Sequence, residues 1–101
     1  MTLAVARIGD TFIDTDIIKT GSGNVFTNNI PTARLTDVTV GHTLPGHTWY
    51  PSVPIVTGSG SVFVNNLPIA RLTDKHAVHC DTHPDCHDSI IKTASGNVFS
   101  G

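Results

Sequence analysis

The stretch "TGSGNVFTNNIPTARLTD" at residues 20–37 returns, with four substitutions, as "TGSGSVFVNNLPIARLTD" at residues 57–74. A third copy is divided between the two ends of the chain. Its first half is "TASGNVFSG" at 93–101, and its second half is "LAVARIGD" at 3–10. The two halves make one unit only when they lie side by side. We therefore expect the terminal strands to pair and to close three units into a ring, which leaves few free strand edges.

Each unit has the pattern of a β-hairpin. The two complete copies place a pair of asparagines, Asn28-Asn29 and Asn65-Asn66, between two short apolar runs. Asparagine tolerates positive φ, so both pairs predict two-residue turns. Gly, Pro, Thr and Asn interrupt every window of ten residues, and apolar residues never recur at helical spacing. We predict a single all-β domain spanning residues 1–101, with pseudo-threefold symmetry and no helix.

Alternation along the strands predicts two apolar faces. One face is expected to form a small core of three phenylalanines, three alanines and three aliphatic residues: Phe26, Ala33, Leu35, Phe63, Ala70, Leu72, Phe99, Ala6 and Ile8. The opposite face carries three arginines and a second apolar set: Arg34, Arg71 and Arg7 with Val25, Ile30, Val62, Leu67 and Val98. This second set is either a partner interface or is covered by the connecting loops.

The composition limits what such a chain can do. Hydrophobic residues make up 39% and charged residues 14% of the sequence, which argues against disorder, while aromatics make up only 6%, which leaves few large side chains for a core. We expect a metal, a partner or oligomerisation to supply the missing stability. A net charge of −2 argues against a nucleic-acid partner. The N-terminus "MTLAVARIGD" lacks a signal peptide's basic start, and no apolar run is long enough to span a bilayer, so we expect synthesis in the cytoplasm.

Three loops connect the repeats, and two of them hold all six histidines and both cysteines. His42 and His79 each follow the aspartate that ends a repeat by five residues, so they are repeat-equivalent. Asp14 and His87 are equivalent when counted back from the next strand. In a closed threefold ring the loops emerge on one side and converge, which predicts that these side chains meet.

Imidazole and thiolate are good ligands for Zn²⁺ and Fe²⁺, so we predict one structural ion, zinc with iron as the alternative. The expected ligands, in order, are His42, His47 and His87, then Cys86 and His83, and last His79, Cys80 and Asp14. A disulfide between Cys80 and Cys86 is the alternative to thiolate ligation. We do not expect an enzyme, because the chain contains no glutamate to act as a metallohydrolase base and nothing in its spacing demands a Ser-His-Asp triad.

The segments Pro31-Thr32-Ala33-Arg34 and Pro68-Ile69-Ala70-Arg71, each after an Asn-Asn turn and before "LTD", resemble the PAAR repeat. Val5-Ala6-Arg7 resembles a degenerate copy with Ala4 in place of proline. The resemblance covers essentially the whole chain. It implies a small cone that caps the trimeric β-helical spike of a type VI secretion system or a contractile phage tail. The cone would be stiffened by a metal and would lead the spike through a target cell envelope.

By the same resemblance, the middle-loop ligand positions of the family fall on His42 and His47, and the third-loop position falls on His87 with Cys86 beside it. The first-loop position, usually histidine, falls on Asp14. The apolar set Val25, Ile30, Val62, Leu67 and Val98 would bind the spike. The protein would reach the virion tail tip or leave the cell with the injection apparatus, touching a membrane only during piercing, and could carry effectors non-covalently. The alternative is a free-standing metal-binding adaptor that docks effectors or other proteins.

Overall fold

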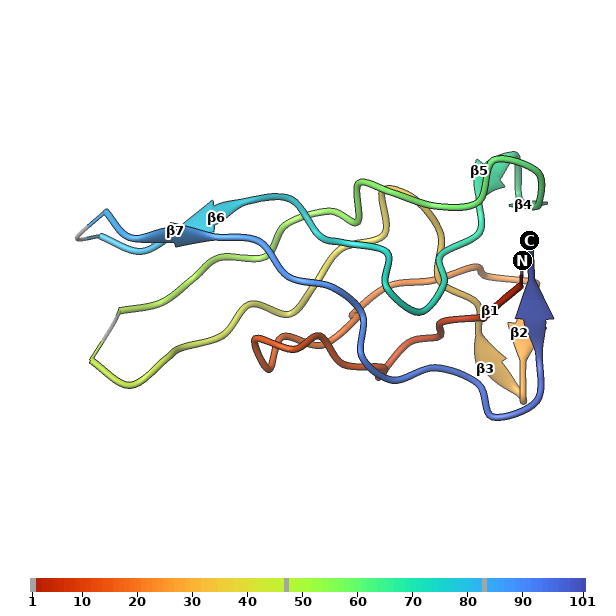
Figure 1. The fold of residues 1–101 in the computed structure, drawn as a ribbon, viewed down its shortest axis with the longest axis horizontal. Coiled ribbons are helices and arrows are strands. Elements are labelled where there is room, and N and C mark those ends of the chain that lie inside the picture. The colour runs from red at the N-terminus through yellow and green to blue at the C-terminus, as the bar shows by residue number, and fades with distance from the viewer. Residues whose placement is uncertain (1, 47, 83) are drawn as a thin grey trace.

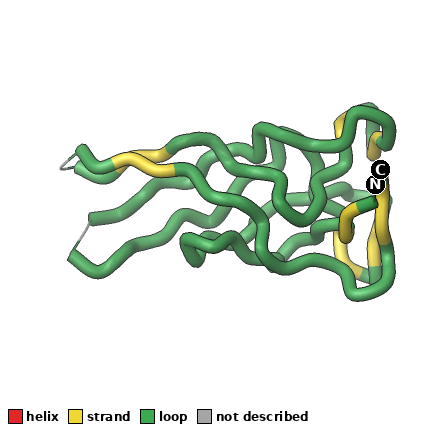
Figure 2. Tube along the Cα trace, viewed as in Figure 1, coloured by secondary structure: helices red, strands yellow, loops and turns green. Residues whose placement is uncertain are grey.

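The computed structural model describes residues 2–46, 48–82 and 84–101. The described residues are all-β, as predicted, and contain no helix. Figure 2 shows that most of the chain is irregular and that the strands are short. The strands are β1 (Leu3–Ala4), β2 (Phe26–Thr27), β3 (Ile30–Pro31), β4 (Phe63–Val64), β5 (Leu67–Pro68), β6 (His79–Cys80), β7 (Cys86–His87) and β8 (Phe99–Ser100).

Each of the three copies of the repeat contains one strand pair, and the three pairs are equivalent. β2 pairs with β3 and β4 with β5, and the turns between them have positive φ at both asparagines, from 53° to 66°. These values are typical of a type I′ turn, whose twist matches that of the flanking strands. The third pair joins β1 to β8, with Leu3 opposite Ser100 and Ala4 opposite Phe99. The predicted pairing of the two ends of the chain is therefore confirmed.

A closed ring of backbone hydrogen bonds lies at the centre of the three repeats. The amide of Ala6 donates to the carbonyl of Ala70, Ala70 donates to Ala33, and Ala33 donates to Ala6, each at 3.0 Å. All three alanines have no exposed surface. The backbones of three segments meet here, so a small side chain is needed at this position of the repeat, and alanine recurs for that reason.

The core matches the prediction only at the three alanines, because the predicted aliphatic residues Ile8, Leu35 and Leu72 are half-buried and lie outside the buried cluster. The three alanines are buried together with Phe12, Ile18, Ile55 and Ile91, whereas Phe26, Phe63 and Phe99 are 55–56% exposed. The prediction assumed one continuous strand from Ile30 to Leu35. The hairpin pairing continues past Pro31, since the amide of Thr32 donates to the carbonyl of Val25 at 3.0 Å and the hydroxyls of Thr27 and Thr32 are hydrogen-bonded to each other. Thr32 and Ala33 are neighbours and both are buried, so both faces of the chain are covered at this point, whereas the face of Phe26 in the hairpin is not.

Each repeat is fixed internally by an arginine and an aspartate three residues later. The Nε–Oδ2 distances are 3.0 Å for Arg7–Asp10, 2.9 Å for Arg34–Asp37 and 3.0 Å for Arg71–Asp74. In each case the same carboxylate also accepts the arginine's own backbone N–H at 2.8 Å. The recurring Arg-x-x-Asp motif therefore closes a turn at the end of every repeat, and the connecting loops leave from these turns.

The molecule is elongated, with extents of 38 × 24 × 22 Å. Figure 1 shows the three repeat pairs and both termini at one end, which we call the base, and β6 and β7 near the other end, which we call the apex. The loops pair with one another through single bridges as they run toward the apex: Ile18 with Thr39, Ile55 with His76, and Phe12 with Ile91. In the described part of the chain, nothing qualifies as a membrane-spanning helix.

Candidate metal centre

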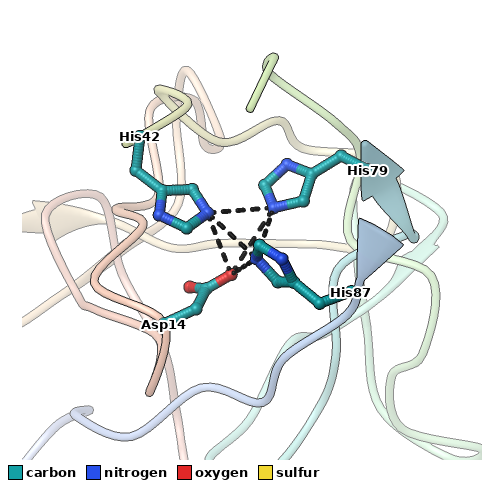
Figure 3. A group of neighbouring side chains, drawn as sticks. All are labelled: Asp14, His42, His79 and His87. Atoms are coloured by element: carbon teal, nitrogen blue, oxygen red, sulfur yellow. Dashed lines mark hydrogen bonds and ion pairs between the residues drawn. The ribbon is translucent and has the colours of Figure 1, made fainter. Parts of the chain in front are cut away.

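Four side chains from three loops meet between the base and the apex. Asp14 lies in the turn of the first loop, where Thr15 has a φ of 76°. His42 comes from the second loop, and His79 and His87 are directly opposite each other on β6 and β7. Figure 3 shows the four side chains pointing at a common point. Their donor atoms lie within 4.8 Å of one another.

The four donor atoms form a nearly regular tetrahedron. The three histidine Nε2 atoms are 3.0–3.1 Å apart. Asp14 Oδ2 lies 2.9 Å from His87, 3.2 Å from His42 and 3.5 Å from His79. Zinc bound at about 2.0–2.1 Å needs a donor–donor edge of about 3.3 Å in a tetrahedral site. The six edges lie close to this value, so the residues present fit a tetrahedral ion with three nitrogen donors and one oxygen donor.

The electrostatics of the centre favour ligands in their metal-binding forms. Burial lowers the pKa of His42, and the neighbouring His79 and His87 lower it further, which outweighs the attraction of Asp14 and Asp16. Burial alone would raise the pKa of Asp14, but the hydrogen bond from the Asp16 backbone and the contacts with His76 and His42 bring that pKa below its usual value. Neutral imidazole and ionised carboxylate are the forms that coordinate metal ions.

A second carboxylate lies beneath the first. Asp16 is completely buried, and its Oδ1 accepts the backbone N–H groups of Ile17 and Gly41. Its Oδ2 has no hydrogen-bond partner among the residues that the structure describes. A buried carboxylate is costly without a compensating charge. A divalent cation held by Asp14 and the three neutral imidazoles would supply compensating positive charge near Asp16.

All three histidines of the cluster are also oriented by their surroundings. His79 Nδ1 lies 2.8 Å from the carbonyl oxygen of Pro51 and donates to it, which leaves Nε2 free to bind an ion. Tyr50 is buried, and its ring stacks on His42 with centroids 5.1 Å apart. The same ring meets His87 edge-on at 4.4 Å. These contacts restrict the rotation of the imidazoles before any ion arrives.

The structure corrects the expectation of thiolate ligands. Cys80 and Cys86 form a disulfide across β6 and β7, and no free cysteine is present. The two residues are opposite each other in the strand pair, one position beyond the two histidines, so their sulfurs bond to each other and lie outside the cluster of donor atoms. The disulfide thus cross-links the ribbon that supplies two donors. The sequence alone left this alternative open.

The other predicted ligands have different outcomes. The structure brings His42 and His87, both expected first, together with His79 and Asp14, which were expected last. His47 and His83 lie outside the described residues. Two residues beside the cluster were missed: the buried Asp16, and His76, whose Nε2 lies 2.7 Å from Asp14 Oδ2. A signal for His76 exists, because it follows Asp74 by two residues, as the fully buried Phe12 and Thr39 follow their aspartates.

Comparison with known protein families identifies one match. The family model described as the PAAR motif matches residues 10–81, which is more than half of the chain. A comparison with curated proteins finds no relative.

Proposed function

The chain belongs to the PAAR motif family, and we propose that it forms a metal-stabilised tip on the trimeric β-helical spike of a contractile injection machine. The machine is a phage tail or a type VI secretion system. In this role the base binds the spike, and the apex leads it through the envelope of the target cell.

The observation that carries this proposal is the threefold apolar surface of the base. Phe26, Phe63 and Phe99 occupy equivalent positions in the three repeats and are each more than half exposed. Of the predicted interface residues, Val25 and Val98 are 37% exposed, Ile30 and Leu67 are half-buried, and Val62 packs against the buried Val5, Val64 and Ile69. A single chain can match the threefold end of a trimer only if it presents one surface three times, and exposed apolar surface of this kind is typical of protein interfaces.

The docking surface can be tested by pull-down with a trimeric spike ending in its C-terminal β-helix. Replacing Phe26, Phe63 and Phe99 together by aspartate should abolish binding, because three charges would be buried against the apolar end of the spike. A matched control places aspartate at three exposed apolar residues on the loops: Ile13, Val40 and Val78. If the base variant folds and still binds as well as the control, the docking surface is wrong and the adaptor alternative gains support.

We further propose that Asp14, His42, His79 and His87 hold the ion, with zinc preferred because the donors approach a tetrahedron and are mainly nitrogen. When bound, the ion would tie three loops and the β6–β7 ribbon together. The double substitution of His42 and His87 by alanine should remove the ion from the purified protein, as measured by elemental analysis. It should also lower the melting temperature, because binding to the folded state stabilises it by about 2.7 kcal/mol when free metal is 100-fold above Kd. An unchanged metal content would contradict the ligand assignment.

A further inference from the structure

His76 lies next to the proposed metal centre but outside its donor set. Its side chain is completely buried, and its ring packs edge-on against Phe12 with centroids 4.8 Å apart. Both ring nitrogens face oxygen atoms: Nδ1 lies 2.7 Å from the carbonyl of Ala77, and Nε2 lies 2.7 Å from Asp14 Oδ2. Carbonyl and carboxylate oxygens both only accept, so the ring makes both hydrogen bonds with a proton on each nitrogen: Nδ1 donates to Ala77 and Nε2 donates to Asp14, which together fix the orientation of the ring.

The Asp14 carboxylate is held at both of its oxygens. Oδ1 accepts the backbone N–H of Asp16 at 3.0 Å. Oδ2 lies against His76 and is also the oxygen that faces His42 and His87. An aspartate side chain has two rotatable bonds, and fixing them costs conformational entropy. Without a contact that fixes them in advance, this cost reduces the free energy of metal binding. A contact that orders the carboxylate in advance therefore strengthens the site.

We propose that His76 is a positioning residue, which directs Asp14 Oδ2 into the donor set and thereby raises the affinity of the site for a divalent cation. This inference rests on the metal site proposed above. The residue acts through Asp14 and does not bind the ion itself. Outer partners of this kind typically change metal affinity by 10–100-fold when they are removed.

A role for His76 as a ligand of a second ion does not fit the geometry. Asp16, His76 and His79 also form a group whose donor atoms lie within 4.8 Å of one another. His79 Nε2, however, already lies 3.0 Å from the Nε2 atoms of His42 and His87, and its Nδ1 is used by the Pro51 carbonyl. One nitrogen cannot coordinate two ions, so we expect one ion per chain.

The test compares two substitutions of similar polarity. The amide nitrogen of glutamine can take the place of imidazole Nε2, whereas that of asparagine takes the place of Nδ1. His76→Gln therefore keeps the donor to Asp14, and His76→Asn loses it. After removal of metal with a chelator, each protein is titrated with Zn²⁺, and with Co²⁺ followed by its visible absorption. His76→Asn should bind both ions 10–100-fold more weakly than the wild type, while His76→Gln should bind them almost as tightly.

The same titrations in an Asp14→Ala background separate positioning from general packing. Since His76 acts through Asp14, adding His76→Asn to Asp14→Ala should cause no further loss, and the Co²⁺ spectra of the two proteins should coincide. Three results would each overturn the inference. The first is an equal loss of metal affinity in His76→Gln and His76→Asn, and the second is a further loss of affinity when His76→Asn is added to Asp14→Ala. The third is a stoichiometry of two ions per wild-type chain. A wild-type chain that binds neither ion would instead overturn the metal site itself.

Discussion

The substitution Ala33→Val tests the closed ring of alanines at the centre of the fold. Ala33 has no exposed surface, and its backbone amide and carbonyl bond to Ala6 and Ala70. Valine adds two methyl groups where three backbones meet, and they can be accommodated only by separating the repeats. Adding methyl groups to a packed core typically costs about 1–3 kcal/mol. At about 4–8 °C per kcal/mol for a domain of this size, the melting temperature should fall by roughly 5–20 °C.

Ala77→Val is the matched control for this measurement. Ala77 follows Asp74 by three residues, and the equivalent positions after Asp10 and Asp37 hold Ile13 and Val40, which are 60% and 44% exposed. Two of the three loops thus already have a branched side chain at the position equivalent to Ala77. Both variants are unfolded by heat and followed by circular dichroism, with the metal content held equal. If Ala33→Val is no less stable than Ala77→Val, the ring is not a close-packed centre.

Two further predictions concern acid and the turns. In the metal-free protein the pKa of His42 is lowered, so on acidification below about 6.5 the unfolded chain takes up a proton there before the folded chain does. Stability should therefore fall as the pH drops from 6.5 through the lowered value, and His42→Gln should flatten that part of a urea-unfolding series; an equally steep loss in the variant would show that His42 is not the cause. Thr36 and Thr73 have φ values near 75° in turns whose third equivalent holds Gly9. Since branched residues are strained at positive φ, replacing both threonines by glycine should leave the protein as stable or raise its melting temperature, and a clear decrease would contradict this reading of the turn.

The repeat was sufficient to predict the architecture because its number of copies and their positions in the chain imply a closed threefold arrangement. Two complete copies and one divided copy require the ends of the chain to pair, and β1 and β8 do so. Which faces are buried was harder to predict, because alternation says which side chains share a face and not how much of that face is covered. Phe26 and Ala33 were assigned to one face, but only Ala33 lies where three backbone segments meet, while Phe26 lies in a hairpin of the base and is exposed. Phe26 and its two equivalents were wrongly placed in the core for this reason.

The donor set was only partly predictable for a different reason. Counting positions from the repeats made His42 equivalent to His79 and Asp14 equivalent to His87, and the structure gathers all four. Ranking by residue type placed Cys86 above Asp14, whereas Cys86 lies in a disulfide and Asp14 lies in the cluster. The strand pair β6–β7 has no recognisable pattern in the sequence. Its register sets Cys80 opposite Cys86, and this proximity allows the two cysteines to form a disulfide.

The asymmetry of the loops fits the metal site proposed above. Three loops converge from a threefold base, whereas a tetrahedral ion has four ligands, so in the proposed site one loop supplies two of them. Two side chains of one loop can meet only if that loop folds back on itself, which is what β6 and β7 do when they set His79 opposite His87. The first loop, which is the shortest, places Asp14 in the cluster from its turn, where Asp14 Oδ2 lies 2.7 Å from His76 Nε2 of the third loop. The repeats can therefore remain nearly identical, while the differences that a metal site requires are confined to the loops.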